Sequence, residues 1–168
     1  DESRYRVEIY LTDTPTTIVW TGFLVPDRYS EPYTNGTFYP AFEASDGLGR
    51  LKGKFLADAY YVNEYSVIEY ITQCLLLTGL ELPINLSAAI ENVSVKNYKD
   101  IYLIGTDFTT TSKQMDAYAI LQDILESMVC VLYQSDNQWW VEGLNKRHLQ
   151  TVSFYNYEAD GTYIDVTK

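Results

Sequence analysis

The segment "EASDGLGRLKGKF", residues 43–55, marks the place where the sequence changes its character. Before it, apolar residues recur mainly at every second position, and after it they recur about every 3.6 residues, so strands should give way to helices. The segment itself holds three glycines and three basic residues. This composition fits either a loop that binds phosphate or a turn that carries the chain from a β-rich unit into a helical one.

The spacing of these glycines favours the turn. A phosphate-binding loop needs glycine N–H groups that converge on the anion and a helix that follows at once. Residues 46–54 match neither the Walker spacing nor the GxGxxG spacing, and the next predicted helix begins only at residue 66. We therefore expect a structural corner in which Gly47 and Gly49 provide backbone freedom and Leu48 and Leu51 point inward. Arg50 and Lys52 are expected to stay in water. The corner residues are Asp46, Gly47, Leu48, Gly49 and Leu51.

Upstream of the corner, the pattern predicts three strands. Residues 5–11 alternate between apolar and polar side chains, and the turn formers Asp13 and Pro15 separate them from a second strand that ends near Phe23. A third strand is expected over residues 37–44. Pro40 cannot donate a ladder hydrogen bond, so this strand should lie at a sheet edge or contain a bulge.

Downstream of the corner, the sequence predicts two helices. The first covers residues 66–78, because Ser66 and Glu69 form a capping-box pattern and Gly79 supplies a stop. The second helix follows the same capping pattern at Thr111 and Gln114. Its apolar stripe has helical spacing and consists of Ala117, Ile120, Leu121, Ile124, Leu125 and Met128.

Two hairpins are predicted after the second helix. The first joins residues 129–134 to residues 138–144, and the second turns at Asp160-Gly161. Residues 82–108, between the helices, are expected to be a connection with short extended or helical pieces. The predicted class is therefore α+β, with antiparallel β-hairpins at both ends and two central helices packed on them. We expect a β-rich unit over 1–56 that ends in the corner and a unit of helices and hairpins over 57–168, as one compact module or two in contact.

Charge and composition limit the classes of function. The net charge is −11, from 23 acidic and 12 basic residues, so the average field repels phosphates and argues against direct nucleic-acid binding. Cys74 and Cys130 lie in apolar segments and are expected to be buried thiols. With one histidine and no CxxC spacing, we expect no metal site. No apolar run approaches the roughly 20 residues that span a bilayer, and we expect no membrane segment.

No residue pattern selects a catalytic site. Carboxylates are numerous, but no spacing singles out an acid/base pair, and His148 lies in a polar stretch without a nucleophile motif. We therefore expect no enzyme activity and no cofactor.

Trp139 and Trp140 should point to opposite faces of a strand, one into the core and the other at least partly exposed. These two tryptophans are the interface candidates.

The order of residues around the corner resembles that of a known group of proteins. Residues 19–56 contain a W-x-G-x-L strand, a D-x-Y-x-E-P-Y turn, a further strand and A-x-D-G-L-x-x-L-K. The group is the baseplate-hub or tail-tip group of tail proteins from long-tailed bacteriophages and prophages. Residues 115–144 resemble its later segment, a helix that leads to a tryptophan-containing hairpin, whereas Pro40 departs from the pattern. The matching positions are Trp20, Gly22, Leu24, Asp27, Tyr29, Glu31, Pro32, Tyr33, Ala44, Asp46, Gly47, Leu48, Leu51 and Lys52.

The resemblance implies a non-catalytic structural module, one domain of a longer tail protein. Its partners would be other tail proteins and further copies of itself in a ring-forming oligomer. It would be located in the virion tail and assembled in the bacterial cytoplasm. Two alternatives stay open: a surface adhesin or carbohydrate-binding module, which 16 tyrosines would suit, and a peptidoglycan-cleaving tail enzyme.

Overall fold

A long antiparallel hairpin of strands β1 (Arg6–Leu11) and β2 (Thr14–Leu24) begins the described part of the protein. The sequence predicts this hairpin, but Pro15, expected in the turn, lies within β2. The computed structural model describes residues 4–12, 14–28, 41–87, 98, 101–110, 113–146 and 152–167. Strand β3 (Ala44–Ser45) pairs with the far end of β2, which gives the order β1-β2-β3. The predicted third strand is thus seen only at its end, and Pro40 lies outside the described residues.

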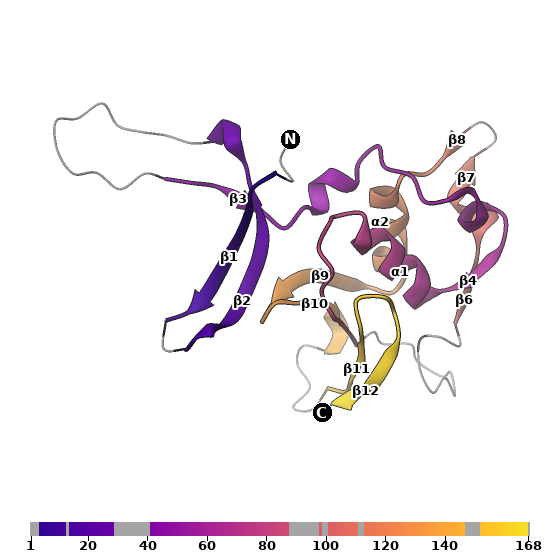
Figure 1. Cartoon of the computed structure of the whole chain (residues 1–168). Coiled ribbons are helices and arrows are strands. Elements are labelled where there is room, and N and C mark those ends of the chain that lie inside the picture. Colours follow the sequence, from indigo (N-terminus) through magenta and orange to yellow (C-terminus); the bar gives the residue numbers. More distant parts are fainter. Residues whose placement is uncertain are drawn as a thin grey trace.

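Helix α1 (Val67–Leu76) starts where the sequence predicts (Figure 1). The Ser66 hydroxyl accepts a hydrogen bond from the N–H of Glu69, and the Glu69 carboxylate accepts one from the N–H of Ser66 at 2.8 Å. The predicted capping box is therefore confirmed.

Helix α2 (Ala117–Ser127) carries the predicted stripe but begins with a different cap. The carboxylate of Asp116 accepts a hydrogen bond from the N–H of Ala119 at 2.9 Å. Gln114 belongs to the short strand β8 (Lys113–Gln114), and Thr111 lies outside the described residues. The predicted capping box was wrong because aspartate is as good an N-cap as threonine and stands directly before the stripe.

A five-stranded sheet with the order β12-β11-β5-β10-β9 lies beneath the helices (Figure 1). The strands on either side of its centre are β9 (Cys130–Ser135), β10 (Gln138–Gly143), β11 (Phe154–Tyr157) and β12 (Tyr163–Thr167). Both predicted hairpins, β9–β10 and β11–β12, are present. Asp136 and Asn137 turn the first with φ of 50° and 56°, and Gly161 takes φ 83° in the second.

The central strand of this sheet, β5 (Ile84–Ser87), was not predicted. It pairs in parallel with β10 and antiparallel with β11, inside the segment that the sequence suggested was a connection. All four residues of β5 are buried, and although they alternate between apolar and polar types, a run of only four residues is too short to identify a strand. Two short strand pairs accompany the helices: β4 (Glu64–Ser66) pairs with β6 (Tyr102–Ile104), and β7 (Thr109–Thr110) pairs with β8. In the described residues the protein is thus a mixed α+β fold.

The main core forms between the helices and one face of the five-stranded sheet. Strand register places large buried side chains on this face, namely Ile84, Leu86, Trp139, Val141 and Tyr157. They join the buried face of α1 and α2 in one cluster. Cys74 and Cys130 are both buried thiols, as predicted, and burial raises the pKa of Cys74 to about 12.

The N-terminal hairpin is tied to the rest of the fold by hydrogen bonds to the β9–β10 hairpin. The N–H of Thr21 donates to the side chain of Gln134 at 2.7 Å, and the Gln134 amide donates back to the Thr21 carbonyl at 2.9 Å. The N–H of Asn137 donates to the carbonyl of Val19 at 3.0 Å. Phe23 adds an apolar contribution, since its side chain belongs to the main core.

Candidate functional site

The corner starts with a left-handed residue. Gly47 has φ 84°, and its N–H donates to the hydroxyl of Ser45 at 3.1 Å. The N–H of Leu48 donates to the carboxylate of Asp46 at 3.1 Å, which opens a short 3₁₀ turn over Leu48–Leu51. Positive φ is costly for any residue with a side chain, so the sequence needs glycine at this position.

Three backbone N–H groups of the corner donate to acceptors within the chain. Besides Gly47 and Leu48, the N–H of Arg50 donates to the carbonyl of Gly47 at 3.0 Å. Lys54 directs its ammonium group to the carbonyl of Leu77 at 2.6 Å, and burial, with Arg50 nearby, lowers the pKa of Lys54. This geometry supports a structural corner over a phosphate-binding loop.

Two details of the corner differ from the expectation. Gly49 is exposed, its φ is not positive, and an added Cβ would have open space, so backbone freedom is not required there. Arg50 does not stay in water: its guanidinium lies over the ring of Phe23, 4.8 Å from the centroid, and donates to the carbonyl of Thr78 at 3.4 Å. Lys52 is exposed, as expected.

We expect Gly47→Val to destabilise the fold by about 1–3 kcal/mol, the cost of a strained backbone conformation. A Cβ at this position would also lie 3.2 Å from the carbonyl oxygen of Thr78. Thermal melts of the variant beside Gly49→Val measure the effect, and the Gly49 variant should stay close to wild type. Equal melting temperatures for Gly47→Val and wild type would contradict the strained geometry.

The end of the corner is joined to the start of α2. The N–H of Gly53 donates to one carboxylate oxygen of Asp116 at 2.8 Å, while the other oxygen caps the helix at Ala119. Burial by itself would raise the pKa of Asp116, but these two backbone donors, with Lys113 and Lys52 nearby, lower it below the ordinary value. One carboxylate therefore fixes the corner and the helix relative to each other.

Asp116→Ala should lower the free energy of unfolding by about 1 kcal/mol at neutral pH, the usual cost of a lost N-cap. Because folding lowers the pKa of Asp116, its stabilisation is present above the unfolded pKa of about 3.9 and is lost as the pH falls through the lower folded value. Urea titrations from pH 7 to pH 2 should show the two proteins converging in acid. Asp123→Ala, on the exposed face of the same helix, is the control, and a gap that persists at pH 2 would contradict the argument.

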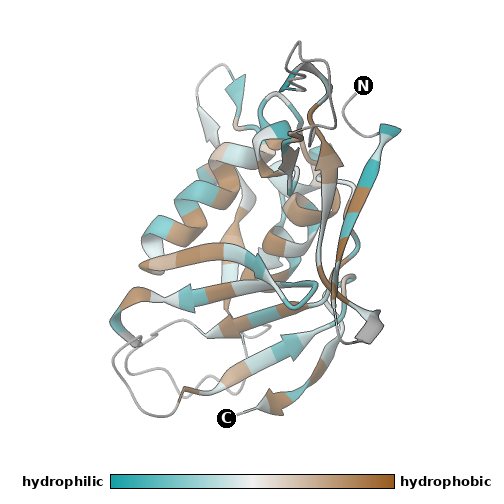
Figure 2. Cartoon of the chain, turned by 90° about the vertical axis from the view of Figure 1, so that its left-hand side faces the viewer, coloured by the Kyte–Doolittle hydropathy of each residue, from teal (hydrophilic) through white to brown (hydrophobic). Residues whose placement is uncertain are grey.

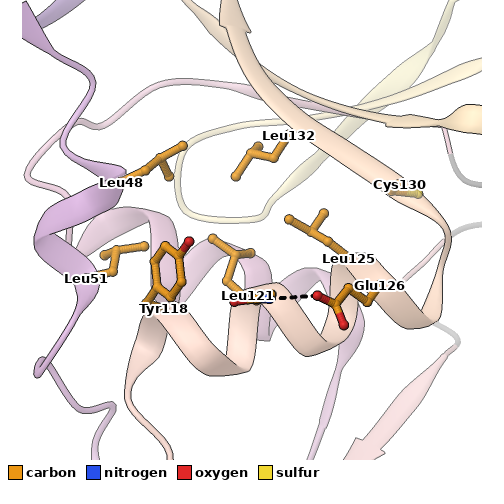
Figure 3. A pocket seen from close by; sticks show the side chains of 9 residues that line it. Leu48, Leu51, Tyr118, Leu121, Leu125, Glu126, Cys130 and Leu132 are labelled. Carbon is orange, nitrogen blue, oxygen red and sulfur yellow. Dashed lines mark hydrogen bonds between the residues drawn. The ribbon is translucent and has the colours of Figure 1, made fainter.

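An apolar groove opens between the corner, α2 and β9 (Figure 3). Its volume is about 350 Å³. Leu51 and Leu121 are buried, whereas Leu48, Leu125 and Leu132 are only half-buried and keep apolar surface towards solvent. The full lining consists of Leu48, Leu51, Tyr118, Leu121, Gln122, Leu125, Glu126, Cys130 and Leu132.

The rim of the groove is polar. The Gln122 amide donates to the carboxylate of Glu126 at 2.7 Å, and both residues are exposed on α2. An apolar centre with a polar rim is the usual composition of a protein contact surface, and none of the described residues that line the groove is basic.

The two tryptophans have separate roles. Trp139 has 0% of its surface exposed and lies in the main core, so it cannot contribute to a contact surface and is corrected to a core residue. Trp140 is half-buried on the other face of the sheet, where its Nε1–H donates to the carbonyl of Ser135 at 2.9 Å and its ring packs edge-on against Phe154. Of the pair, only Trp140 remains an interface candidate.

Three further expectations concern a metal site, a membrane segment and His148. Within the described ranges, no group of three or more His, Cys, Asp or Glu side chains could hold a metal ion. Across the same residues, no helix combines the length and the apolar character needed to cross a membrane. His148 lies outside the part of the chain that the structure describes.

Fold and surface together define a mixed α+β protein with an apolar groove at its corner. Comparisons of the chain with protein-family models, curated proteins and solved structures find no match.

Sequence reasoning found the corner but missed the groove. Leu48 and Leu51 were expected inside, and Leu125 was assigned to the same stripe as Leu121. The available signal for the groove was the width of the apolar stripe on α2. A helix whose apolar residues cover a wide arc has more apolar surface than one neighbouring layer covers. Leu132, on β9, could be added only once the sheet was known.

Proposed function

We propose that this chain is a non-catalytic structural module of a phage or prophage tail, in the baseplate hub or tail tip, and that it mediates protein–protein assembly. The observation that carries the proposal is the apolar groove. Leu48 and Leu51 of the groove belong to the A-x-D-G-L-x-x-L-K pattern on which the resemblance to tail proteins rests. One segment thus links the sequence resemblance to a surface suited to binding another protein.

The rest of the proposal follows from this role. The partners are other tail proteins and further copies of the chain in a ring-forming oligomer, the location is the virion tail, and assembly takes place in the bacterial cytoplasm. Within this module, the hairpins at both ends and the two central helices packed on them form one compact unit or two in contact. The net charge of −11 suits a wall along which DNA moves without adhering, because like charges repel. No direct binding of nucleic acid is expected.

The test has two parts. Mass spectrometry of density-purified virions should detect peptides of this chain in stoichiometric amounts, and their absence would contradict a tail location. A photo-crosslinking amino acid at Leu125, in the groove, should then link the chain to another tail protein. The same amino acid at Asp123, on the exposed face of α2, should give little product. Equal crosslinking at both positions would rule out the groove as the binding surface.

A further inference from the structure

The outer edge of β1 has no strand beside it in the part of the chain that the structure describes. Among the described residues, β1 pairs with β2 only and forms the end of its sheet. In Figure 2, the strand that begins beside the N mark carries alternating hydrophilic and hydrophobic residues. An edge strand of this length offers a row of backbone N–H and C=O groups to any strand that can pair with it.

The alternation of backbone hydrogen bonds between β1 and β2 decides which residues of β1 direct their N–H and C=O groups to the outer edge. The N–H of Leu24 donates to the carbonyl of Tyr5 at 2.9 Å, so Tyr5 and Leu24 form a hydrogen-bonded pair. Antiparallel strands alternate between such pairs and non-hydrogen-bonded ones. With the observed register, Val7 and Ile9 also direct their backbone groups to β2, and Arg6 and Glu8 direct theirs away from the sheet.

Charge selects one register for pairing with a second copy. An added antiparallel strand must place outward residues opposite outward residues. The charged outward residues of β1 are Arg6 and Glu8, so Arg6 can face Arg6, Glu8 can face Glu8, or Arg6 can face Glu8. The first two arrangements bring like charges together, which is unfavourable across strands. Each strand already holds an ion pair between Arg6 Nε and Glu8 Oε1, 3.0 Å apart. The third arrangement adds two opposite-charge pairs across the strands, related by a twofold axis, with Val7 opposite Val7 and Tyr5 opposite Ile9.

The exposed apolar side chains fit this arrangement. Tyr5 and Ile9 are 52% and 50% exposed, although the alternation over residues 5–11 is typical of a strand whose apolar face is covered. In the selected register they would pack against each other across the new strand pair. The edges of the other long sheet lack such charge complementarity: β9 carries no charged residue, and β12 carries Asp165 with no basic partner.

We propose that two copies of this chain associate through β1, which joins their N-terminal sheets into one continuous antiparallel sheet with Arg6 of each copy opposite Glu8 of the other. The contact is small and therefore weak, and it forms at high local concentration, as in an assembly of many copies. This inference names one contact for the self-association that the proposed function includes, but it does not depend on a location in the virion tail.

Sedimentation equilibrium of the 168-residue chain, from micromolar to millimolar concentration, should detect a monomer–dimer equilibrium. In the proposed register, Arg6→Glu brings two carboxylates face to face in each pair, and Glu8→Arg brings two guanidinium groups face to face. Each variant should raise the dimer dissociation constant by about tenfold or more, because two like-charge pairs replace two favourable ones. Lys113→Glu and Asp123→Arg make the same changes in net charge on other exposed surfaces and should leave the dimer unchanged.

Mixing the two variants distinguishes a loss of strand pairing from a loss of folding. An equimolar mixture of Arg6→Glu and Glu8→Arg should form a heterodimer, since every facing pair then joins opposite charges. The double variant Arg6→Glu/Glu8→Arg should dimerise like wild type. A wild-type chain that stays monomeric at all concentrations, or self-association that neither single variant weakens, would overturn the proposal. Neither result bears on whether virions contain the chain, so the two proposals fail separately.

Discussion

Trp139→Ala should cost about 3–5 kcal/mol of folding free energy, the largest loss expected from a single substitution in this protein. The indole is fully buried on β10, beside Ile84 of β5 and facing the helices. Its removal leaves a large cavity at the centre of the sheet. Urea unfolding monitored by far-UV circular dichroism measures the loss.

Comparison with two other variants tests the placement of the tryptophans. Trp139→Phe should retain most of the stability, because the buried Nε1–H of Trp139 has no acceptor among the described residues and phenylalanine deletes it. Trp140→Ala should cost much less than Trp139→Ala, since Trp140 is only half-buried. A larger loss at Trp140 than at Trp139 would show that the faces of β10 are reversed.

Leu121→Ala should lower the free energy of unfolding by about 2–5 kcal/mol, towards the lower end of this range. Leu121 is 3% exposed and packs in the main core, but it also borders the groove, where neighbouring side chains can shift into the space that the truncation leaves. Chemical denaturation with an unchanged m-value would identify this as a loss of native-state packing.

Two neighbours on α2 serve as controls for this prediction. Leu125→Ala should cost only about 1 kcal/mol, because part of its side chain is already in contact with water. Gln122→Ala removes an exposed hydrogen bond and should change stability little. Equal effects at Leu121, Leu125 and Gln122 would mean that α2 does not present the face described above.

Local signals predicted the parts of the fold that depend on few neighbours. The capping box at Ser66 and Glu69 and the turn at Asp160-Gly161 act within a few residues, and both are confirmed. The central place of β5 in the sheet depends on β10 and β11, which lie much later in the chain, so the short alternating pattern of β5 itself could not indicate it. Alternation in β1 predicted a strand but could not tell whether another layer covers its apolar side.

In the candidate site, too, only the features that depend on local sequence could be predicted. The positive φ of Gly47 follows from local turn chemistry, and the structure has it. The contact of Arg50 with Phe23 and Thr78 needs three segments to meet, and no local pattern indicates it. The choice between Trp139 and Trp140 as the buried residue required the register of β10 against β5.

The central place of β5 has a consequence for the order of folding. Both of its neighbours in the sheet, β10 and β11, are synthesised long after it, and a parallel strand pair cannot form through a local turn. Closing such a long stretch of chain has an entropic cost that is met only when the pairing is complete, so folding should be slow for a chain of this size. A ribosome-bound chain that ends before β10 would hold β5 without partners, and stable protection of its amides should arise only after the last hairpin has been released.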